Sequence, residues 1–219
     1  MKNNKNKFCI FYIVRHGETE WNVKGIMQGQ KNSRLNKNGI NQAKKIAKFF
    51  KNVKFDKIFS SDLMRTKKTA EIIAIEHQMA VACNKLLRER NFGDYQGKKV
   101  SVYRKQLKGL LKKRNNLPKK ERFKFKLQDN IESDEEIVSR LITFLRETAI
   151  AYPGKKILIV CHGGLMRTFL IHLGFAEYEE LPSGSIKNTG YAVVESDGVD
   201  FFVKETFGIN KKNNFTLEI

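Results

Sequence analysis

Two runs of apolar residues have the length of a β-strand and contain almost no polar interruption. They are FCIFYIV, residues 8–14, and KKILIVC, residues 155–161, which is apolar after its two lysines. A strand that is apolar at successive positions is expected where helices cover both faces of a parallel sheet. We therefore predict two central strands here, and shorter strands in FDKIFSS and MAVACN, residues 55–61 and 79–84.

Apolar residues at intervals of three and four predict helices between and after these strands. One helix is expected over residues 37–51, and a second over residues 61–78 with Ser61 as its N-cap. Ser133 is followed by three acids, which suit the positive end of a helix dipole, and it opens a third helix. A fourth helix is expected over residues 163–174, where a glycine ends it.

The order of these elements predicts the fold class. YAVVES and DFFVKETF, residues 191–196 and 200–207, are separated by Asp197-Gly198 and predict a hairpin. Strands that alternate with helices indicate an α/β fold, a three-layer sandwich in which helices flank a mostly parallel central sheet. With three prolines and no linker rich in serine and glycine, the chain is expected to form a single domain over residues 1–219.

A basic segment interrupts the alternation of strands and helices. Residues 98–126 contain thirteen lysines and arginines against one acid, Glu121. We expect an insertion around residues 98–129, a helical excursion over one end of the sheet. Two interpretations stay open: the segment covers the active site and selects anionic substrates by steering, or it is the solvated face of a lysine-rich protein.

The net charge of +19 favours phosphates, nucleic acids and acidic membranes as partners. Lysine and asparagine are abundant throughout, however, and no zinc-finger, RNP or helix-turn-helix pattern occurs, so no specific nucleic-acid partner is expected. The apolar run in residues 8–14 is too short to span a membrane and lacks a cleavage pattern. We therefore expect a cytoplasmic protein without a membrane partner.

The three cysteines, Cys9, Cys83 and Cys161, lie far apart and form neither a disulfide framework nor a CxxC metal site. Cys9 and Cys83 lie in strand-like runs, where we predict buried thiols. This cysteine usage fits a reducing compartment.

Polar residues of the types that serve in catalysis and ligand binding follow three of the predicted strands. Arg15-His16 follow the first strand, Arg65 lies one turn into the helix after the second, and His162 follows Cys161. Ligands of open α/β sheets bind at the carboxyl ends of the strands, so these side chains are expected to converge. Arginines and helix N-termini both favour phosphate, and the set contains no metal-ligand pattern.

A second chemistry is possible at the same place. Cys161 precedes Arg167 by the spacing of a cysteine phosphatase loop, in which a thiolate attacks phosphorus. Such a pattern of two residues arises easily by chance, and it leaves His16, Arg65 and Glu89 without a role. A cysteine-dependent phosphatase is the remoter alternative.

Five ordered segments resemble the sequence elements of the histidine phosphatase superfamily, also called the phosphoglycerate-mutase-like family. They are RHGETEWN (15–22), GIMQGQKNSRLNKNGINQA (25–43), SSDLMRTKKTA (60–70), LRERNFGDYQG (87–97) and CHGGLMR (161–167). KNTG, residues 187–190, resembles the family's asparagine-containing turn, and the resemblance extends from Phe8 to about Phe207. One departure is Asn32, where the family usually has aspartate.

The resemblance implies a role for each matching residue. His16 would be the nucleophile that becomes a phosphohistidine, with its second ring nitrogen donating to a backbone carbonyl. Arg15, Arg65 and His162 would surround the phosphoryl oxygens and stabilise the charge that develops in transfer. Glu89 would protonate the leaving oxygen and then deprotonate the acceptor.

The family also implies a pocket for a small phosphorylated substrate, with no cofactor and no metal. The substrate-binding residues implied are Thr19, Asn22, Gln28, Gly29, Phe92 and Gly163. Arg167 is expected to orient other residues through an ion pair rather than to bind phosphate. Nothing in the sequence indicates an oligomeric state.

The resemblance leaves two activities open. Mutases of the family hold the carboxylate of phosphoglycerate with a lysine three residues after the QG pair and with an adjacent arginine pair. Here Val100 stands at the lysine position and no Arg-Arg dipeptide occurs, although Lys99 or Arg114 could substitute. We therefore expect a phosphomonoester hydrolase, with a 2,3-bisphosphoglycerate-dependent phosphoglycerate mutase as the alternative.

Overall fold

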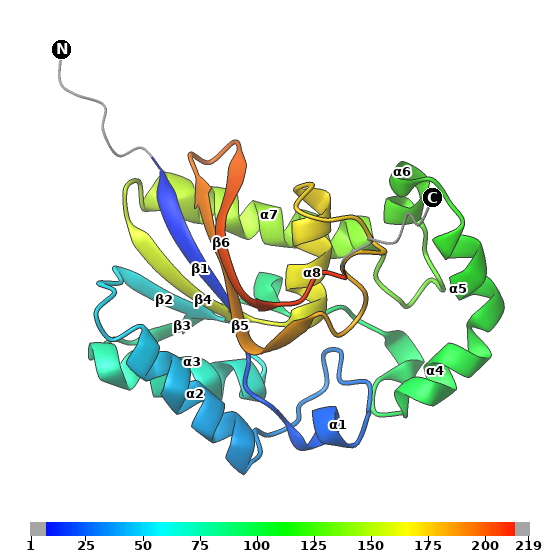
Figure 1. Ribbon diagram of the computed structural model, residues 1–219, viewed down its shortest axis with the longest axis horizontal. Helices are drawn as coiled ribbons and strands as arrows, with labels where there is room; N and C mark the ends of the chain where they lie inside the picture. Colours follow the sequence, from blue (N-terminus) through cyan, green and yellow to red (C-terminus); the bar gives the residue numbers. More distant parts are fainter. Residues whose placement is uncertain (1–7, 213–219) are drawn as a thin grey trace, which may run out of the picture.

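A six-stranded sheet crosses the centre of the computed structural model, which describes residues 8–212 (Figure 1). The strand order is β3 (Val81–Cys83), β2 (Lys57–Ser60), β4 (Lys156–Cys161), β1 (Cys9–Arg15), β5 (Ile186–Ser196) and β6 (Phe201–Ile209). The first four of these run parallel to one another, whereas β5 is antiparallel to both β1 and β6. The mostly parallel sheet and the C-terminal hairpin are therefore confirmed.

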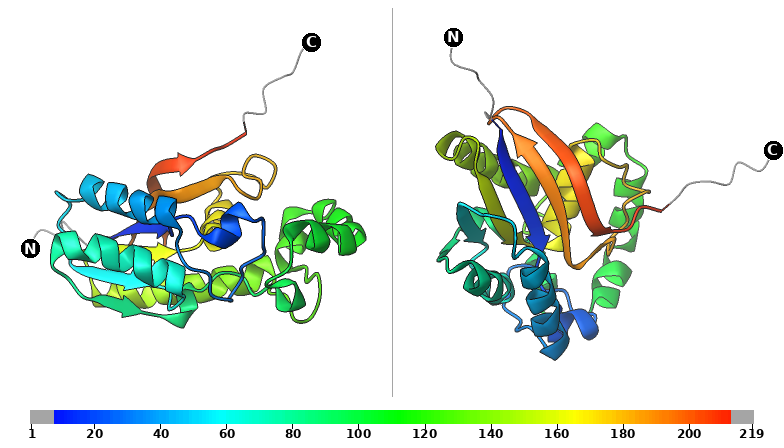
Figure 2. Two further views of the ribbon diagram at one scale, coloured as in Figure 1. Left: turned by 90° about the horizontal axis from the view of Figure 1, so that it is seen from below. Right: turned by 60° about the vertical axis from the view of Figure 1, so that its left-hand side comes forward.

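The described part of the chain contains eight α-helices. They are α1 (Glu20–Val23), α2 (Lys37–Phe49), α3 (Met64–His77), α4 (Val100–Gln106), α5 (Lys108–Asn115), α6 (Lys119–Lys124), α7 (Asp134–Ala151) and α8 (Gly163–His172), with short 3-10 turns η1 (Lys85–Leu87) and η2 (Gly93–Tyr95). Helices α2 and α3 pack on one face and α7 and α8 on the other (Figure 2). This arrangement is the predicted three-layer sandwich.

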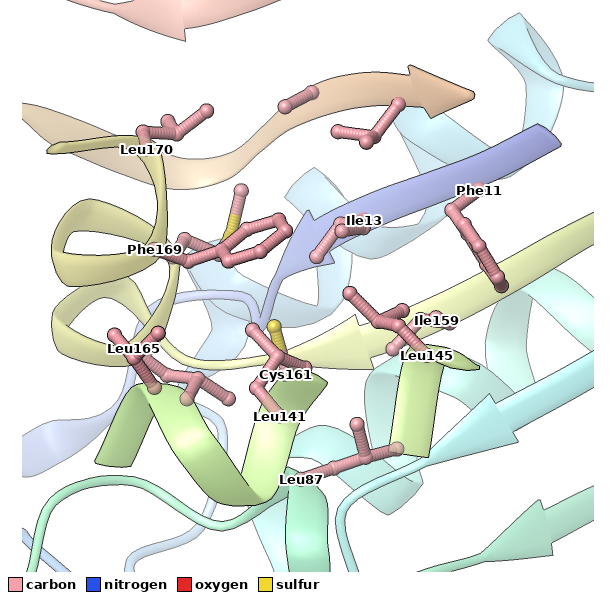
Figure 3. Packing of buried hydrophobic residues seen from close by; sticks show 14 of the residues in the cluster. Phe11, Ile13, Leu87, Leu141, Leu145, Ile159, Cys161, Leu165, Phe169 and Leu170 are labelled. Atoms are coloured by element: carbon pink, nitrogen blue, oxygen red, sulfur yellow. The ribbon is translucent and has the colours of Figure 1, made fainter. Parts of the chain in front are cut away.

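The uninterrupted apolar strands contribute side chains to two separate hydrophobic cores, one on each face of the sheet. In β1, Phe11 and Ile13 belong to the core beneath α7 and α8, whereas Val14 belongs to the core beneath α2 and α3. Strand β4 divides in the same way, with Ile159 and Cys161 on the α7–α8 side (Figure 3). Successive strand residues point to opposite faces, so a sheet covered on both faces needs apolar residues at every position.

Two local predictions are wrong. Ser61 is not the N-cap of α3, because the helix begins later and Leu63 occupies that position without a side-chain cap. Instead, Asn32 Oδ1 accepts a hydrogen bond from the backbone N–H of Met64 at 2.9 Å, so a distant loop caps the helix. Cys83 is exposed rather than buried, because β3 lies at the edge of the sheet.

The basic segment forms the three short helices α4, α5 and α6, at the side of the molecule opposite β3 (Figure 1). The segment is therefore helical, as predicted, and it lies beside the sheet. A small cluster of its own, built around Tyr95, Tyr103 and Leu107, supports the segment. Within residues 8–212, no helix combines the length and the apolar character that crossing a membrane requires.

Candidate active site

A cavity of about 220 Å³ lies where β1 ends and α8 begins. Its walls come from the ends of parallel strands and from the loops that follow them, the usual ligand position in such sheets. Most of the predicted site residues line it. They are Arg15, His16, Asn22, Gln28, Gly29, Arg65, Glu89, Phe92 and Gly163.

His16 is buried and held in one tautomer. Its Nδ1 lies 2.7 Å from the backbone carbonyl oxygen of Gly17. A carbonyl oxygen only accepts, so Nδ1 carries the proton and Nε2 keeps its lone pair. Burial, followed by the positive charges of Arg65 and Arg15, lowers the pKa of His16 well below its usual value. The ring is therefore neutral near pH 7, with an unprotonated nitrogen available for attack.

His162 has the complementary tautomer. Arg65 Nε donates to His162 Nδ1 at 3.2 Å, so the proton of the neutral ring lies on Nε2. Burial and the charge of Arg65 lower the pKa of His162 well below its usual value, which keeps the ring neutral. His162 Nε2 is buried without a hydrogen-bond partner in the described part of the chain. The centroids of its ring and the His16 ring are 5.4 Å apart, so this unused donor lies beside the nucleophile.

Arg65 is 1% exposed and organises the loop that forms one wall of the cavity. Its Nη1 donates to the carbonyl oxygen of Lys31 at 2.9 Å and its Nη2 to that of Gly29 at 2.7 Å. Arg15 donates through Nη1 to the carbonyl oxygen of Ile186, while its Nε has no partner among residues 8–212. Two guanidinium groups with burial-lowered pKa values therefore face one small space.

The carboxylate of Glu89 lies at the N-terminus of α8. Its Oε2 accepts from the backbone N–H of Gly164 at 2.9 Å, and its Oε1 accepts from the backbone N–H of Arg90 at 2.8 Å. A Cβ atom on Gly164 would lie 2.6 Å from Glu89 Oε1. The absence of a side chain at Gly164 therefore allows the carboxylate to approach the helix end closely.

Three residues chosen from the sequence have other positions. His162 is fully buried and is not among the residues that line the cavity. Thr19 does not line the cavity, because it is fully buried as the N-cap of α1, where its hydroxyl accepts from the backbone N–H of Asn22 at 3.1 Å. Arg167 forms no ion pair within the described residues. Its guanidinium instead donates to the carbonyl oxygens of Leu181 and, at 3.4 Å, Tyr178, and it lines the cavity.

Several supporting residues were not identified from the sequence. Arg140 in α7 donates to the carbonyl oxygens of Leu86 at 2.7 Å and of Glu89 at 3.0 Å, so it fixes the segment that carries the carboxylate. Nothing in the local pattern of α7 signals this contact. Asn188 Nδ2 donates to the carbonyl oxygen of His16 at 3.0 Å. Asn188 belongs to the KNTG segment, so in this case a signal was present, although the structure places this segment in an irregular part of β5 rather than in a turn.

Cys161 does not line the cavity. Its side chain is fully buried in the core between β4, α7 and α8 (Figure 3). Burial raises the pKa of the Cys161 thiol far above its ordinary value, so the nucleophilic thiolate is disfavoured.

The arrangement has the chemistry of a phosphoryl site. It combines a neutral imidazole with a free nitrogen, unused N–H donors on His162 and Arg15, and a carboxylate at the rim. Charged donors and a helix N-terminus favour binding of a tetrahedral anion. Within residues 8–212, no group of three or more His, Cys, Asp or Glu side chains could hold a metal ion.

Comparisons with known proteins identify similar chains. The family model of the histidine phosphatase superfamily (branch 1) matches residues 11–207. Uncharacterized phosphatase PhoE of Bacillus subtilis is 31% identical over 84% of this chain and 86% of its own. Phosphoglycerate mutase-like protein 4 of Arabidopsis thaliana is 34% identical over 74% of this chain and 69% of its own. The solved structure of Bacillus stearothermophilus YhfR superposes with a TM-score of 0.77 at 26% identity, covering 89% of this chain and 95% of that chain.

Proposed function

The chain belongs to the histidine phosphatase superfamily, and we propose that it hydrolyses phosphomonoesters through a phosphohistidine formed at His16. The observation that carries this proposal is the tautomer of His16, whose Nδ1 bonds to the carbonyl oxygen of Gly17 and leaves Nε2 unprotonated. A nucleophile needs this lone pair, and the low pKa of the buried ring keeps it available.

In the first step, His16 Nε2 attacks phosphorus and the bond from phosphorus to the alcohol oxygen breaks. Glu89 in its acid form gives its proton to that oxygen as the alcohol leaves. Arg15, Arg65 and His162 Nε2 stabilise the charge on the remaining phosphoryl oxygens. Because these groups are already fixed by hydrogen bonds or burial, little reorganisation is needed during transfer.

In the second step, water replaces the alcohol. The Glu89 carboxylate takes a proton from the water molecule, whose oxygen attacks phosphorus and breaks the bond to His16 Nε2. Inorganic phosphate leaves, and Glu89 has regained the proton that it gave in the first step. The two backbone N–H groups that bond to Glu89 hold it in place for both transfers.

The residues that line the cavity favour transfer of the phosphoryl group to water over its transfer to another hydroxyl group of phosphoglycerate. Val100 lines the cavity at the position where family mutases have a lysine. Lys99 does not replace that lysine, because its Nζ donates to the carbonyl oxygen of Lys24 at 2.8 Å and is exposed. Arg114 lies outside the lining of this cavity. These features support the hydrolase rather than the mutase.

A panel of phosphomonoesters, assayed for release of inorganic phosphate, tests the proposal. We expect His16→Ala to lower kcat by about a thousandfold or more, because it removes the atom that forms the intermediate. Cys161→Ser is the control and is expected to keep the wild-type rate, within about twofold, since its side chain lies in the core. The opposite pattern would favour the cysteine mechanism.

The same panel separates the hydrolase from the mutase. Incubation with 3-phosphoglycerate, followed by detection of 2-phosphoglycerate and phosphate, distinguishes interconversion from hydrolysis. Efficient interconversion with negligible release of phosphate would contradict the proposed function.

A further inference from the structure

Another cavity, of about 440 Å³, lies between α3 and the chain that leads into α2, and we call it the α2–α3 groove. None of its lining residues lines the cavity around His16, so the two cavities are separate. The lining comes from the loop before α2, the first turn of α2 and one face of α3, and it consists of Arg34, Leu35, Ile40, Met64, Lys67, Lys68 and Glu71.

Contacts with the rest of the protein hold the walls of this groove in place. Leu35 forms an isolated antiparallel bridge with Thr19. The hydrogen bond from the backbone N–H of Met64 to Asn32 Oδ1 ties the loop to the first residue of α3. Helices α2 and α3 pack side by side (Figure 1). A ligand would therefore meet a groove that is already formed, and binding would require little ordering of the protein.

Three apolar side chains in the groove are in contact with solvent. Leu35 and Ile40 are partly buried, and Met64 is 43% exposed. Among the described residues, none of the three belongs to a hydrophobic core or to the apolar residues packed against one. These side chains are available to a ligand, because covering apolar surface that is otherwise in water is favourable.

The charged side chains of the groove are mostly positive. Arg34, Lys67 and Lys68 are exposed, and Glu71 is the single carboxylate in the described lining. Glu71 Oε2 lies 3.7 Å from Lys68 Nζ, so its one ion pair goes to Lys68. Three cations against one carboxylate leave an excess of positive charge, which favours an anion.

We propose that the α2–α3 groove binds a small amphipathic anion, an aliphatic chain that ends in a carboxylate. The chain would cover Leu35, Ile40 and Met64, and the carboxylate would lie beside Arg34 and Lys67. The described lining contains no aromatic ring, so it suits an aliphatic chain better than a stacked ring. The volume lies within the range of small-molecule sites, roughly 300–1,000 Å³. The inference does not depend on the proposed phosphatase activity.

Two methionines can show where such a ligand binds. Met64 lines the groove, whereas Met27 lines the cavity around His16. The experiment is a titration of the full chain with octanoate near pH 7, followed by NMR of isotope-labelled methionine methyl groups. We expect the Met64 signal to shift with a Kd of about 1 mM, and the Met27 signal to stay in place.

Two further compounds separate the contribution of the chain from that of the charge. Butyrate has the carboxylate but only a short chain, and octanol has the chain but no charge. We expect butyrate to bind at least about tenfold more weakly than octanoate, and octanol about fivefold more weakly. Equal affinity for octanoate and octanol would contradict the role of the cations, and equal affinity for octanoate and butyrate would contradict the role of the apolar residues.

Substitutions of the charged residues should change the affinity in opposite directions. Lys67→Gln removes a cation and should weaken octanoate binding by about threefold, whereas Glu71→Gln removes the carboxylate and should strengthen it by about threefold. Lys44→Gln is the matched control, because it removes a charge from an exposed position of α2 outside the groove. It is expected to keep the wild-type affinity.

Four outcomes would overturn the inference. A shift of the Met27 signal instead of the Met64 signal would place octanoate beside His16. Equal weakening in Lys44→Gln and Lys67→Gln would show that net charge, rather than the groove, attracts the anion. A Met64 signal that responds to protein concentration but not to octanoate would mean that a second copy of the chain occupies the groove. A response only at concentrations where octanoate forms micelles would indicate a lipid surface as the partner.

Discussion

The cavity around His16 and the basic segment beside it are built in different ways. His16, Arg65 and the adjacent His162 are at most 3% exposed, and each is fixed by a hydrogen bond to the protein. In the basic segment, by contrast, α5 has no buried residues and no side-chain cap. The first is built on the ends of the central strands, whereas the second is a group of short helices beside the sheet.

The phosphoryl group is the same in every phosphomonoester, and its transfer depends on donors fixed at defined positions. We therefore expect substitutions around His16 to change the rate of the reaction, and substitutions in α5 to change it little.

The largest effect beyond loss of the nucleophile is expected from Gly164→Ala. The new Cβ would lie 2.6 Å from Glu89 Oε1, so the carboxylate has to move and weaken its bond to the helix N-terminus. A displacement of about 1 Å in a catalytic group can cost about a hundredfold in rate. We expect such a loss in kcat for alkyl phosphates, measured as phosphate release.

Two further measurements sharpen this prediction. The loss should be smaller for p-nitrophenyl phosphate, whose leaving group needs little protonation. Thermal unfolding should show that the variant stays folded, because the clash falls on the end of a flexible side chain. Wild-type rates with alkyl phosphates would show that the position of Glu89 does not limit the reaction.

The second prediction concerns acid sensitivity. Burial is the main reason why the pKa values of His16 and His162 lie well below 6.5 in the folded protein. As the pH falls from about 7.5 to about 5.5, the unfolded chain takes up protons at these two residues and the folded protein does not. The free energy of unfolding should therefore decrease by about 1.4 kcal/mol for each histidine.

Urea unfolding at the two pH values measures this dependence. His16→Asn should reduce the decrease by about 1.4 kcal/mol, since asparagine does not titrate. Helix α5 contains no histidine, so Gly109→Ala should leave the decrease unchanged. The same decrease in wild type and His16→Asn would mean that other groups cause the acid sensitivity.

The smallest effect is expected from Gly109→Ala in α5. This substitution adds the same methyl group as Gly164→Ala, but in a different environment. A Cβ atom on Gly109 would have no heavy atom within 4 Å. Alanine lowers the entropy of the unfolded chain and favours the helix, so unfolding should become harder by about 0.5–1 kcal/mol, measured by urea denaturation. Phosphate release should keep the wild-type rate. A loss of stability would indicate that α5 packs more tightly than its exposure suggests.

Much of the cavity around His16 could be predicted from the sequence because several of its residues directly follow strands. The apolar run of β1 places Arg15 and His16 at the carboxyl end of that strand, and β4 does the same for His162 and Gly163. Thr19 shows the limit of this approach. It lies in the same motif, yet its hydroxyl caps α1 instead of lining the cavity.

Contacts between residues that are far apart in the sequence could not be predicted from these local patterns. The cap of α3 comes from Asn32 rather than from Ser61, because the loop that carries Asn32 folds back over the helix end. Arg140 supports the Glu89 segment from α7, 51 positions along the chain. A periodic pattern shows which face of a helix is buried, but it does not show which polar side chain reaches a particular carbonyl oxygen.

Hydrophobic periodicity was enough to predict the strands, the helices that alternate with them and the residues that follow the strands, because it is a local property of the chain. The proton positions on His16 and His162 follow instead from contacts that form in the folded protein. The hydrogen bond from Arg65 to His162 joins residues 97 positions apart, and it depends on how α3 packs against the sheet.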